Sequence, residues 1–180
     1  MFVSRQQTYI LEVLQKMGCI RRTQLLALVR AAFWRPDLEI TEPRLDVMLR
    51  QLRHITDDVR MDEQMVYLEG CAEQPRYLEA LDVMLELTEG RPREFEVLRG
   101  KEPLLLYFLH GRGRGRGIWV ADLAEGYVIT PQNSDSELGE RTVWISASGE
   151  PPETLLLPLG HFFAARKQDG MHRFYGATET

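Results

Sequence analysis

Cysteine is scarce in this sequence, which holds only Cys19 and Cys71 among its 180 residues. They form no CxxC pair, and no paired histidines stand at the spacing of a tetrahedral zinc site. The sequence therefore indicates no metal site and no other cofactor. So few thiols fit a reducing, cytoplasmic setting.

Long hydrophobic runs are absent as well. Residues 1–18, MFVSRQQTYILEVLQKMG, lack the uninterrupted apolar core of a signal peptide, and no stretch approaches the length that crosses a bilayer. We therefore expect a soluble protein without a membrane partner.

Excess positive charge is the third absence, since the formal net charge is -5 at pH 7. A protein that coats DNA or membranes along its whole surface usually carries a strong basic excess, so any contact with nucleic acid must be local. The 44% of hydrophobic and 27% of charged residues are typical of globular proteins. The length suffices for one medium domain or two small ones.

Two helices are predicted at the start of the chain. A capping box of Ser4 and Gln7 begins the first helix, and Gly18 ends it. A tight connection at residues 19–22 leads to the second helix, which Thr23 caps. The apolar faces of the two helices are Ile10, Val13, Leu14 and Met17, and Leu25, Leu26, Leu28 and Val29.

A third helix is predicted to begin after Thr41, with Pro43 tolerated in its first turn. Its apolar side consists of Leu45, Met48, Leu49 and Leu52. Two short extended runs, VRM and MVYLE, follow on either side of residues 62–64 and indicate a β-hairpin. Three helices followed by a hairpin are the element order of a winged helix-turn-helix domain, which we place at residues 1–72.

Residues 73–180 are predicted to form a small α+β domain with a mainly antiparallel sheet. Its first helix ends near Gly90. The runs PLLLYFLH, GIWVADL and TVWISAS are strand candidates, and HFFAA and MHRFY flank residues 167–170 as a closing hairpin. We expect either a degenerate nuclease-like domain or an oligomerisation domain.

The third helix carries the candidate DNA-binding residues. A recognition helix lies in the major groove and offers its solvent-exposed face to bases and phosphates. The candidates on that face are Arg44, Val47, Arg50, Arg53 and His54. Arginine can read guanine through two hydrogen bonds or hold a phosphate, so Arg50 is the leading candidate and double-stranded DNA the expected partner.

Two alternatives remain open for this helix. It can be an ordinary solvated face, because Asp46 and the acids near the hairpin would repel phosphates. These hairpin acids are Asp57, Asp58, Asp62 and Glu63. It can also be a docking surface for a protein, with Val47 and either Phe33 or Trp34 supplying an apolar contact.

The tract GRGRGRG at residues 111–117 places Arg112, Arg114 and Arg116 between glycines. Guanidinium groups pair with phosphates and stack on bases, so the tract is a candidate loop for single-stranded nucleic acid. An exposed hairpin tip is the alternative. The GK[ST] ending of a P-loop is missing, which excludes a nucleotide-binding loop of that type.

Signatures of catalysis are weak, since no GxSxG or HExxH motif occurs. Two groups of polar side chains remain, His161, Asp169 and His172 at the last hairpin, and Glu94, Glu96 and Asp122 around the central strands. Histidines on edge strands are usually structural, and the acids lack the lysine that a nuclease sheet places beside them. We predict that the chain is not an enzyme.

The segments CIRRTQLLALV and TEPRLDVMLRQLRHI and the hairpin ending MVYLEG resemble the winged helix of replication-relaxation type proteins and their relatives of unknown function on bacterial mobile elements. The segment from PLLLYFLH to GIWVADLAEG is similar to the β-rich second domain of some of those relatives. The resemblance implies a DNA-linked role in plasmid or conjugative-element maintenance. We therefore expect a non-enzymatic accessory or regulatory DNA-binding protein, with a protein partner or a homodimer formed through the second domain.

Overall fold

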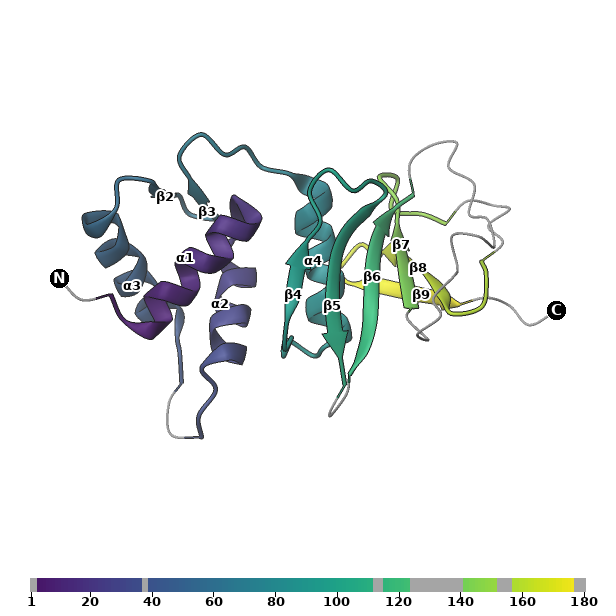
Figure 1. Ribbon diagram of the computed structural model, residues 1–180, viewed down its shortest axis with the longest axis horizontal. Coiled ribbons are helices and arrows are strands. Elements are labelled where there is room, and N and C mark those ends of the chain that lie inside the picture. The colour runs from purple at the N-terminus through teal and green to yellow at the C-terminus, as the bar shows by residue number, and fades with distance from the viewer. Residues whose placement is uncertain (1–2, 37–38, 112–114, 124–140, 152–156, 177–180) are drawn as a thin grey trace. The chain divides into compact units, whose positions relative to one another are not determined.

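The computed structural model describes residues 3–36, 39–111, 115–123, 141–151 and 157–176, which form four helices and nine strands (Figure 1). The chain divides into two compact units, Met1–Leu78 and Glu79–Thr180, and the division falls inside the fourth helix. The first unit contains a three-stranded sheet and the second a six-stranded sheet, so the fold class is α+β.

Helix α1 (Arg5–Met17) begins and ends as the sequence predicts. The Ser4 hydroxyl accepts a hydrogen bond from the Gln7 amide at 3.2 Å, and the Gln7 side chain accepts one from the Ser4 amide at 2.9 Å. Gly18, with a φ of 72°, ends the helix and donates its amide hydrogen to Leu14 O at 2.7 Å. Residues with a side chain rarely adopt a positive φ, which explains why glycine occupies this position.

The predicted tight connection after α1 is instead a strand, β1 (Cys19–Arg21), and helix α2 (Arg22–Ala32) follows it directly. Ile20 is fully buried opposite Val66 of the hairpin, so burial fixes these residues in a sheet. The helix is therefore capped by Arg21 and not, as expected, by Thr23. A three-residue strand is too short to show a periodic pattern in the sequence.

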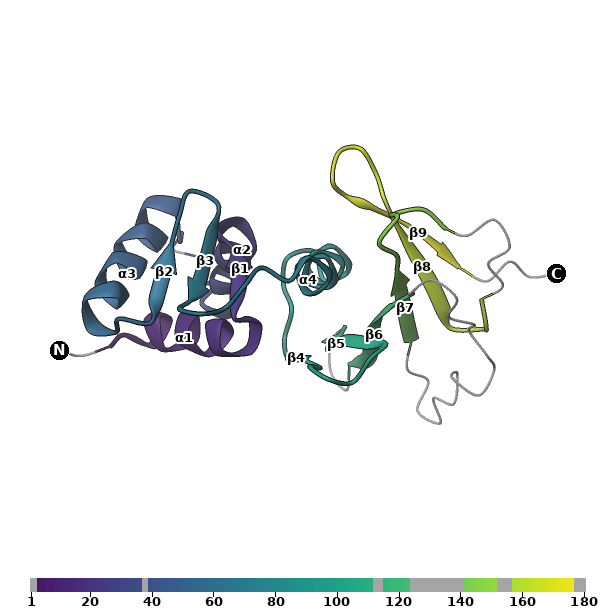
Figure 2. The ribbon, with the colours of Figure 1, turned by 90° about the horizontal axis from the view of Figure 1, so that it is seen from above.

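Helix α3 (Glu42–Ile55) begins after Thr41 as predicted, and strands β2 (Val59–Met61) and β3 (Met65–Leu68) form the predicted hairpin. The first unit's sheet has the order β1-β3-β2 with antiparallel pairing throughout. Figure 2 shows the three helices of this unit beside the small sheet. Their buried apolar side chains form its core, which includes Ile10, Leu14, Leu25, Leu28, Leu45, Leu49, Leu52, Val59 and Val66.

The second unit combines the greater part of helix α4 (Pro75–Leu87) with a six-stranded sheet. The strands follow one another in space as they do in the chain: β4 (Phe95–Val97), β5 (Leu104–His110), β6 (Arg116–Asp122), β7 (Arg141–Ile145), β8 (His161–Arg166) and β9 (His172–Gly176). The closing hairpin β8–β9 is confirmed, whereas β4 was not predicted. With three residues, β4 is also too short for a sequence pattern.

The sheet is mainly antiparallel, as expected, with three antiparallel pairings out of five, but it is mixed, because two pairings are parallel. Strands β6, β7 and β8 run parallel to one another, and the outer pairings are antiparallel. Parallel neighbours need a crossover connection, which a series of strand candidates in a sequence does not reveal. Residues 124–140, which connect β6 to β7, lie outside the described residues.

Candidate nucleic-acid interface

The exposed face of α3 lies opposite the side that packs in the core. Leu45, Leu49 and Leu52 are at most 1% exposed, whereas Val47 on the opposite side is 46% exposed. The candidate contact residues of this helix are all exposed: Arg44, Val47, Arg50, Arg53 and His54. The periodicity of the sequence thus separated the packing side chains of α3 from its solvent-facing side chains.

The acidic residue at the edge of this face, Asp46, is neutralised within the first unit. Asp46 forms an ion pair with Arg22 at the start of α2, and both side chains are partly buried. This contact joins the two helices. From the sequence alone we expected the charge of Asp46 to repel phosphates. In the folded protein the positive charge of Arg22 neutralises it.

Two further hydrogen bonds hold the side chains on α3. The Arg50 Nε donates to the carbonyl oxygen of Asp46 at 3.3 Å, so its guanidinium lies back along the helix toward the preceding turn. Gln51 accepts a hydrogen bond at 2.9 Å from the side chain of Gln7 on α1. Gln51 is therefore engaged within the unit, although its position is exposed.

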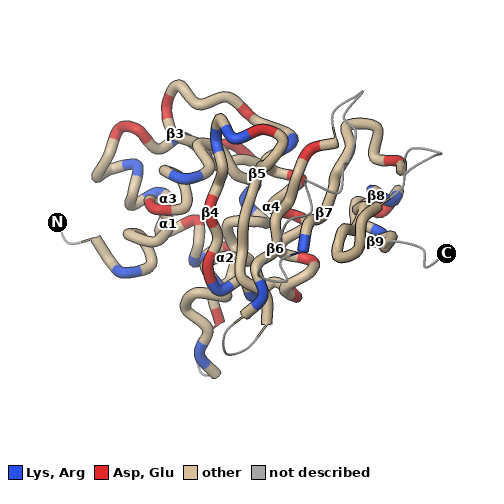
Figure 3. Tube along the Cα trace, turned by 45° about the vertical axis from the view of Figure 1, so that its right-hand side comes forward, with Lys and Arg blue, Asp and Glu red and all other residues tan. Residues whose placement is uncertain are grey.

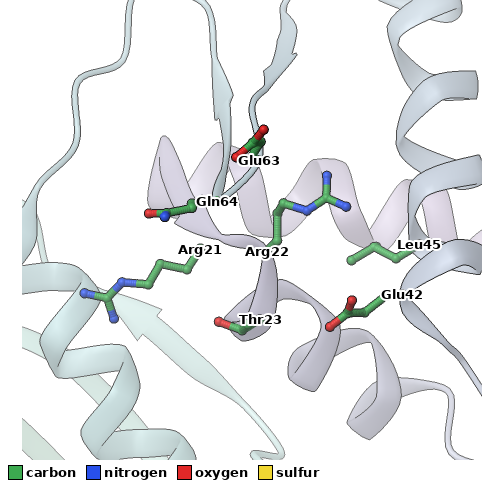
Figure 4. A pocket seen from close by; sticks show the side chains of 7 residues that line it. All are labelled: Arg21, Arg22, Thr23, Glu42, Leu45, Glu63 and Gln64. Carbon is green, nitrogen blue, oxygen red and sulfur yellow. The ribbon is translucent and has the colours of Figure 1, made fainter. Parts of the chain in front are cut away.

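A pocket of about 280 Å³ lies where the starts of α2 and α3 meet the hairpin turn (Figure 4). Its lining residues are Arg21, Arg22, Thr23, Glu42, Leu45, Glu63 and Gln64. In Figure 4 the guanidinium of Arg22 points toward α3 and that of Arg21 points away from it. The positive charges of the two arginines are balanced by the negative charges of the two glutamates. The pocket therefore has no excess positive charge that would select anions.

The β2–β3 turn is acidic and locally ordered. Asp62 accepts hydrogen bonds from the amides of Gln64 and Met65, both at 2.8 Å, and these bonds lower the pKa of its carboxyl group. Asp62 therefore stays ionised and shapes the turn. Helix α3 carries three arginines and two acids, so basic and acidic segments both lie on it in Figure 3, whereas Asp62 and Glu63 make the hairpin turn acidic.

The Arg-Gly tract is described only at its ends. Arg112 and Arg114 lie outside the described residues, and Arg116 begins β6 as an exposed side chain. Its strand pairs with β5, where His110 stands opposite Arg116. The described part of the tract thus places one arginine at the end of a hairpin of the second unit.

Glu96 and Asp122, two of the three acids that the sequence places around the central strands, do not converge. Glu96 on β4 stands in register with Tyr107 and Trp119, and Asp122 is three residues beyond Trp119 on β6. Because side chains alternate along a strand, Glu96 and Asp122 lie on opposite faces of the sheet. In the part of the chain that the structure describes, no three His, Cys, Asp or Glu side chains are placed to hold a metal ion.

The residues His161, Asp169 and His172 are also kept apart. His161 begins β8 and accepts a hydrogen bond from Trp144 Nε1 at 2.9 Å, and burial lowers its pKa. Asp169 lies in the hairpin turn and contacts Lys167 at 3.0 Å. His172 pairs with the opposite end of β8, so the hairpin does not unite the three side chains.

The structure brings together a buried cluster of His172, Glu79 and Glu86 that the sequence did not predict. The side chain of His172 is fully buried between Glu86, 2.8 Å from its Nδ1, and Glu79, 3.5 Å from its Nε2. Asp82 of α4 lies 3.7 Å from Arg166. The spacing of the three acids in the α4 sequence was a signal that they share one side of the helix.

Comparison with models of protein families, with curated proteins and with solved structures found no match to this chain. Among the described residues, no helix has the length and apolar character that spanning a membrane requires.

Proposed function

We propose that the chain is a non-enzymatic DNA-binding protein whose first unit is a winged helix-turn-helix domain with α3 as the recognition helix. The order of its three helices and the hairpin after the third supports this proposal, and the additional strand β1 lies between α1 and α2. The resemblance to proteins of mobile elements extends the proposal to an accessory or regulatory role in plasmid or conjugative-element maintenance.

The observation that carries the proposal is the charge of the exposed side of α3. This side presents the arginines Arg44, Arg50 and Arg53 together with His54. Of the two acids in the helix, Asp46 is ion-paired with Arg22 and Glu42 stands in the first turn. The helix therefore offers DNA a local positive surface on a chain whose net charge is -5.

The acidic hairpin turn indicates which part of the first unit faces away from DNA. Asp62 and Glu63 are both exposed at the turn, and phosphates would be repelled there. In the proposed complex α3 enters the major groove and the turn stays outside the phosphate backbone. Nonspecific affinity is therefore expected to be low, because fewer phosphates are contacted.

The test measures the binding of the protein to a labelled pool of random duplexes by fluorescence anisotropy at low salt. We expect binding that weakens as salt rises, since phosphate contacts release counterions. Arg50→Ala should cost on the order of 1 to 3 kcal/mol on the duplexes that bind best if Arg50 reads a base, and Arg53→Ala should weaken all duplexes alike.

A matched control is Arg5→Ala, which removes an exposed arginine from the first turn of α1 instead of from α3. All three variants should melt as the parent does, because none of these side chains belongs to the core. The absence of duplex binding by the parent would contradict the proposal. So would equal losses in all three variants.

Protein docking is the second candidate function, and the exposure of two apolar side chains favours it. Trp34, after the end of α2, is 65% exposed, and Val47 is 46% exposed. Under this alternative, Trp34→Ala and Val47→Ala weaken a protein contact while Arg50→Ala has little effect. Duplex binding that depends on Arg50 decides against it.

We assign the second unit to protein contacts or oligomerisation within the same proposal. Strands β4 and β9 form the two edges of its sheet. Edge strands can pair through their backbone groups with another chain, which supports this assignment.

A further inference from the structure

We infer that Val47 contacts the 5-methyl group of thymine in the major groove and thereby gives the protein a preference for thymine at one position of its binding site. The inference rests on the proposed function, since it assigns a base to the same face of α3.

Val47 lies on the solvent-facing side of α3. It stands opposite the buried side of α3 that Leu49 represents, and it is 46% exposed. Arg44 and Arg50 stand three residues before and after it, so each lies about 60° to one side of Val47 around the helix. An apolar side chain thus occupies the centre of the exposed face, and the positive charges lie at its flanks.

This arrangement suits a helix in the major groove. The centre of such a helix lies nearest the base edges, and long arginine side chains at its flanks can reach either the neighbouring base edges or the phosphate backbones. Val47 is branched at Cβ, so its two methyl groups are held in few rotamers and present a rigid apolar surface. Among the groups that the base edges display in this groove, the apolar one is the thymine methyl.

The side chains of two polar residues beside Val47, Asp46 and Gln51, are engaged within the protein. Gln51, a residue type that reads adenine, accepts a hydrogen bond from Gln7. Asp46, a type that reads cytosine, is ion-paired with Arg22. Thymine alone adds an apolar methyl group to its hydrogen-bonding edge, whereas adenine, cytosine or guanine opposite Val47 would offer it no methyl group.

The experiment replaces thymine with uracil, which pairs with adenine in the same way and lacks only the 5-methyl group. The protein first selects duplexes from a random pool, and the selected duplex is then made with uracil at each thymine in turn. We expect one uracil position to weaken binding about fourfold, the loss that corresponds to one buried methyl group.

The variant Val47→Ala should bind the thymine and uracil duplexes with nearly equal affinity. The matched control is Val3→Ala, which shortens another exposed valine of the first unit and should keep the fourfold difference. Because Val47 is exposed, thermal melting should be unchanged in both variants.

The possible results distinguish a failure of the thymine preference from a failure of the proposed DNA binding. Equal binding of thymine and uracil duplexes by the parent overturns the inference and leaves DNA binding standing. A difference that persists in Val47→Ala also overturns it, because another residue then reads the methyl group. If the parent binds no duplex at all, both the inference and the proposed function fail.

Discussion

The His172 imidazole is held between two carboxylates with no exposure of its own side chain to solvent. The amide of His172 also donates to the second oxygen of Glu86 at 2.9 Å, so Glu86 contacts both the ring and the backbone at the start of β9. Burial alone would lower the pKa of His172, but the hydrogen bonds and charges of Glu79 and Glu86 raise it above its ordinary value.

This raised pKa predicts how stability depends on pH. A histidine with a higher pKa in the folded state stabilises that state fully below its unfolded pKa, about 6.5, and the contribution disappears as pH rises through the folded value. The parent should therefore exceed His172→Gln in free energy of unfolding by more at pH 6 than at pH 9. Urea unfolding across this range measures the difference.

The control for this experiment is His54→Gln, which removes an exposed histidine on α3. It should leave the pH dependence of unfolding close to that of the parent. A stability difference between the parent and His172→Gln that grows toward high pH would contradict the expectation.

At the scale of elements, the N-caps of α1 and α3 differ in their hydrogen bonds, although both sequences place a favourable capping residue before the helix. Ser4 before α1 and Thr41 before α3 are both residues that favour an N-cap. Ser4 receives the amide hydrogen bond of Gln7, whereas Thr41 makes no capping hydrogen bond through its side chain. Gln7 in turn contacts Gln51, so the cap of α1 is tied to α3.

Ser4→Ala should therefore lower the free energy of unfolding by about 1 kcal/mol, the usual cost of removing an N-cap hydroxyl. Thr41→Ala should cost clearly less, because no capping bond is lost. Chemical denaturation of both variants gives the comparison. Equal losses would show that the capping bond of Ser4 contributes little in solution.

At the scale of the whole molecule, the sheet of the second unit bears on whether the protein is an enzyme. A metal-dependent nuclease needs acidic side chains that share metal ions on one face. Glu96 and Asp122 lie on opposite faces of this sheet, because Glu96 is in register with Trp119 of β6 through Tyr107, and Asp122 is three residues beyond Trp119 on that strand.

We therefore predict that purified protein does not cleave plasmid DNA in the presence of magnesium or manganese. Gel electrophoresis of supercoiled plasmid detects even single nicks. Cleavage that is present in the parent and lost in Glu96→Ala or Asp122→Ala would refute the prediction and assign the second unit to nucleases.

The sequence by itself determined the features that depend on neighbours along the chain. The capping box of Ser4, the stop at Gly18 and the apolar spacing of α3 involve residues within a few positions of one another, so periodicity and cap chemistry suffice to predict them. The same spacing placed Val47 and Arg50 on the exposed side of α3, because the position around a helix follows from residue number.

Only the tertiary structure decided what depends on residues far apart in the chain. Arg22 neutralises Asp46 across 24 positions, and His172 meets Glu86 across 86 positions. The parallel course of β6, β7 and β8 likewise depends on which strand lies beside which. Such contacts arise when burial brings distant segments together, and no local pattern of the sequence encodes which charges then become partners.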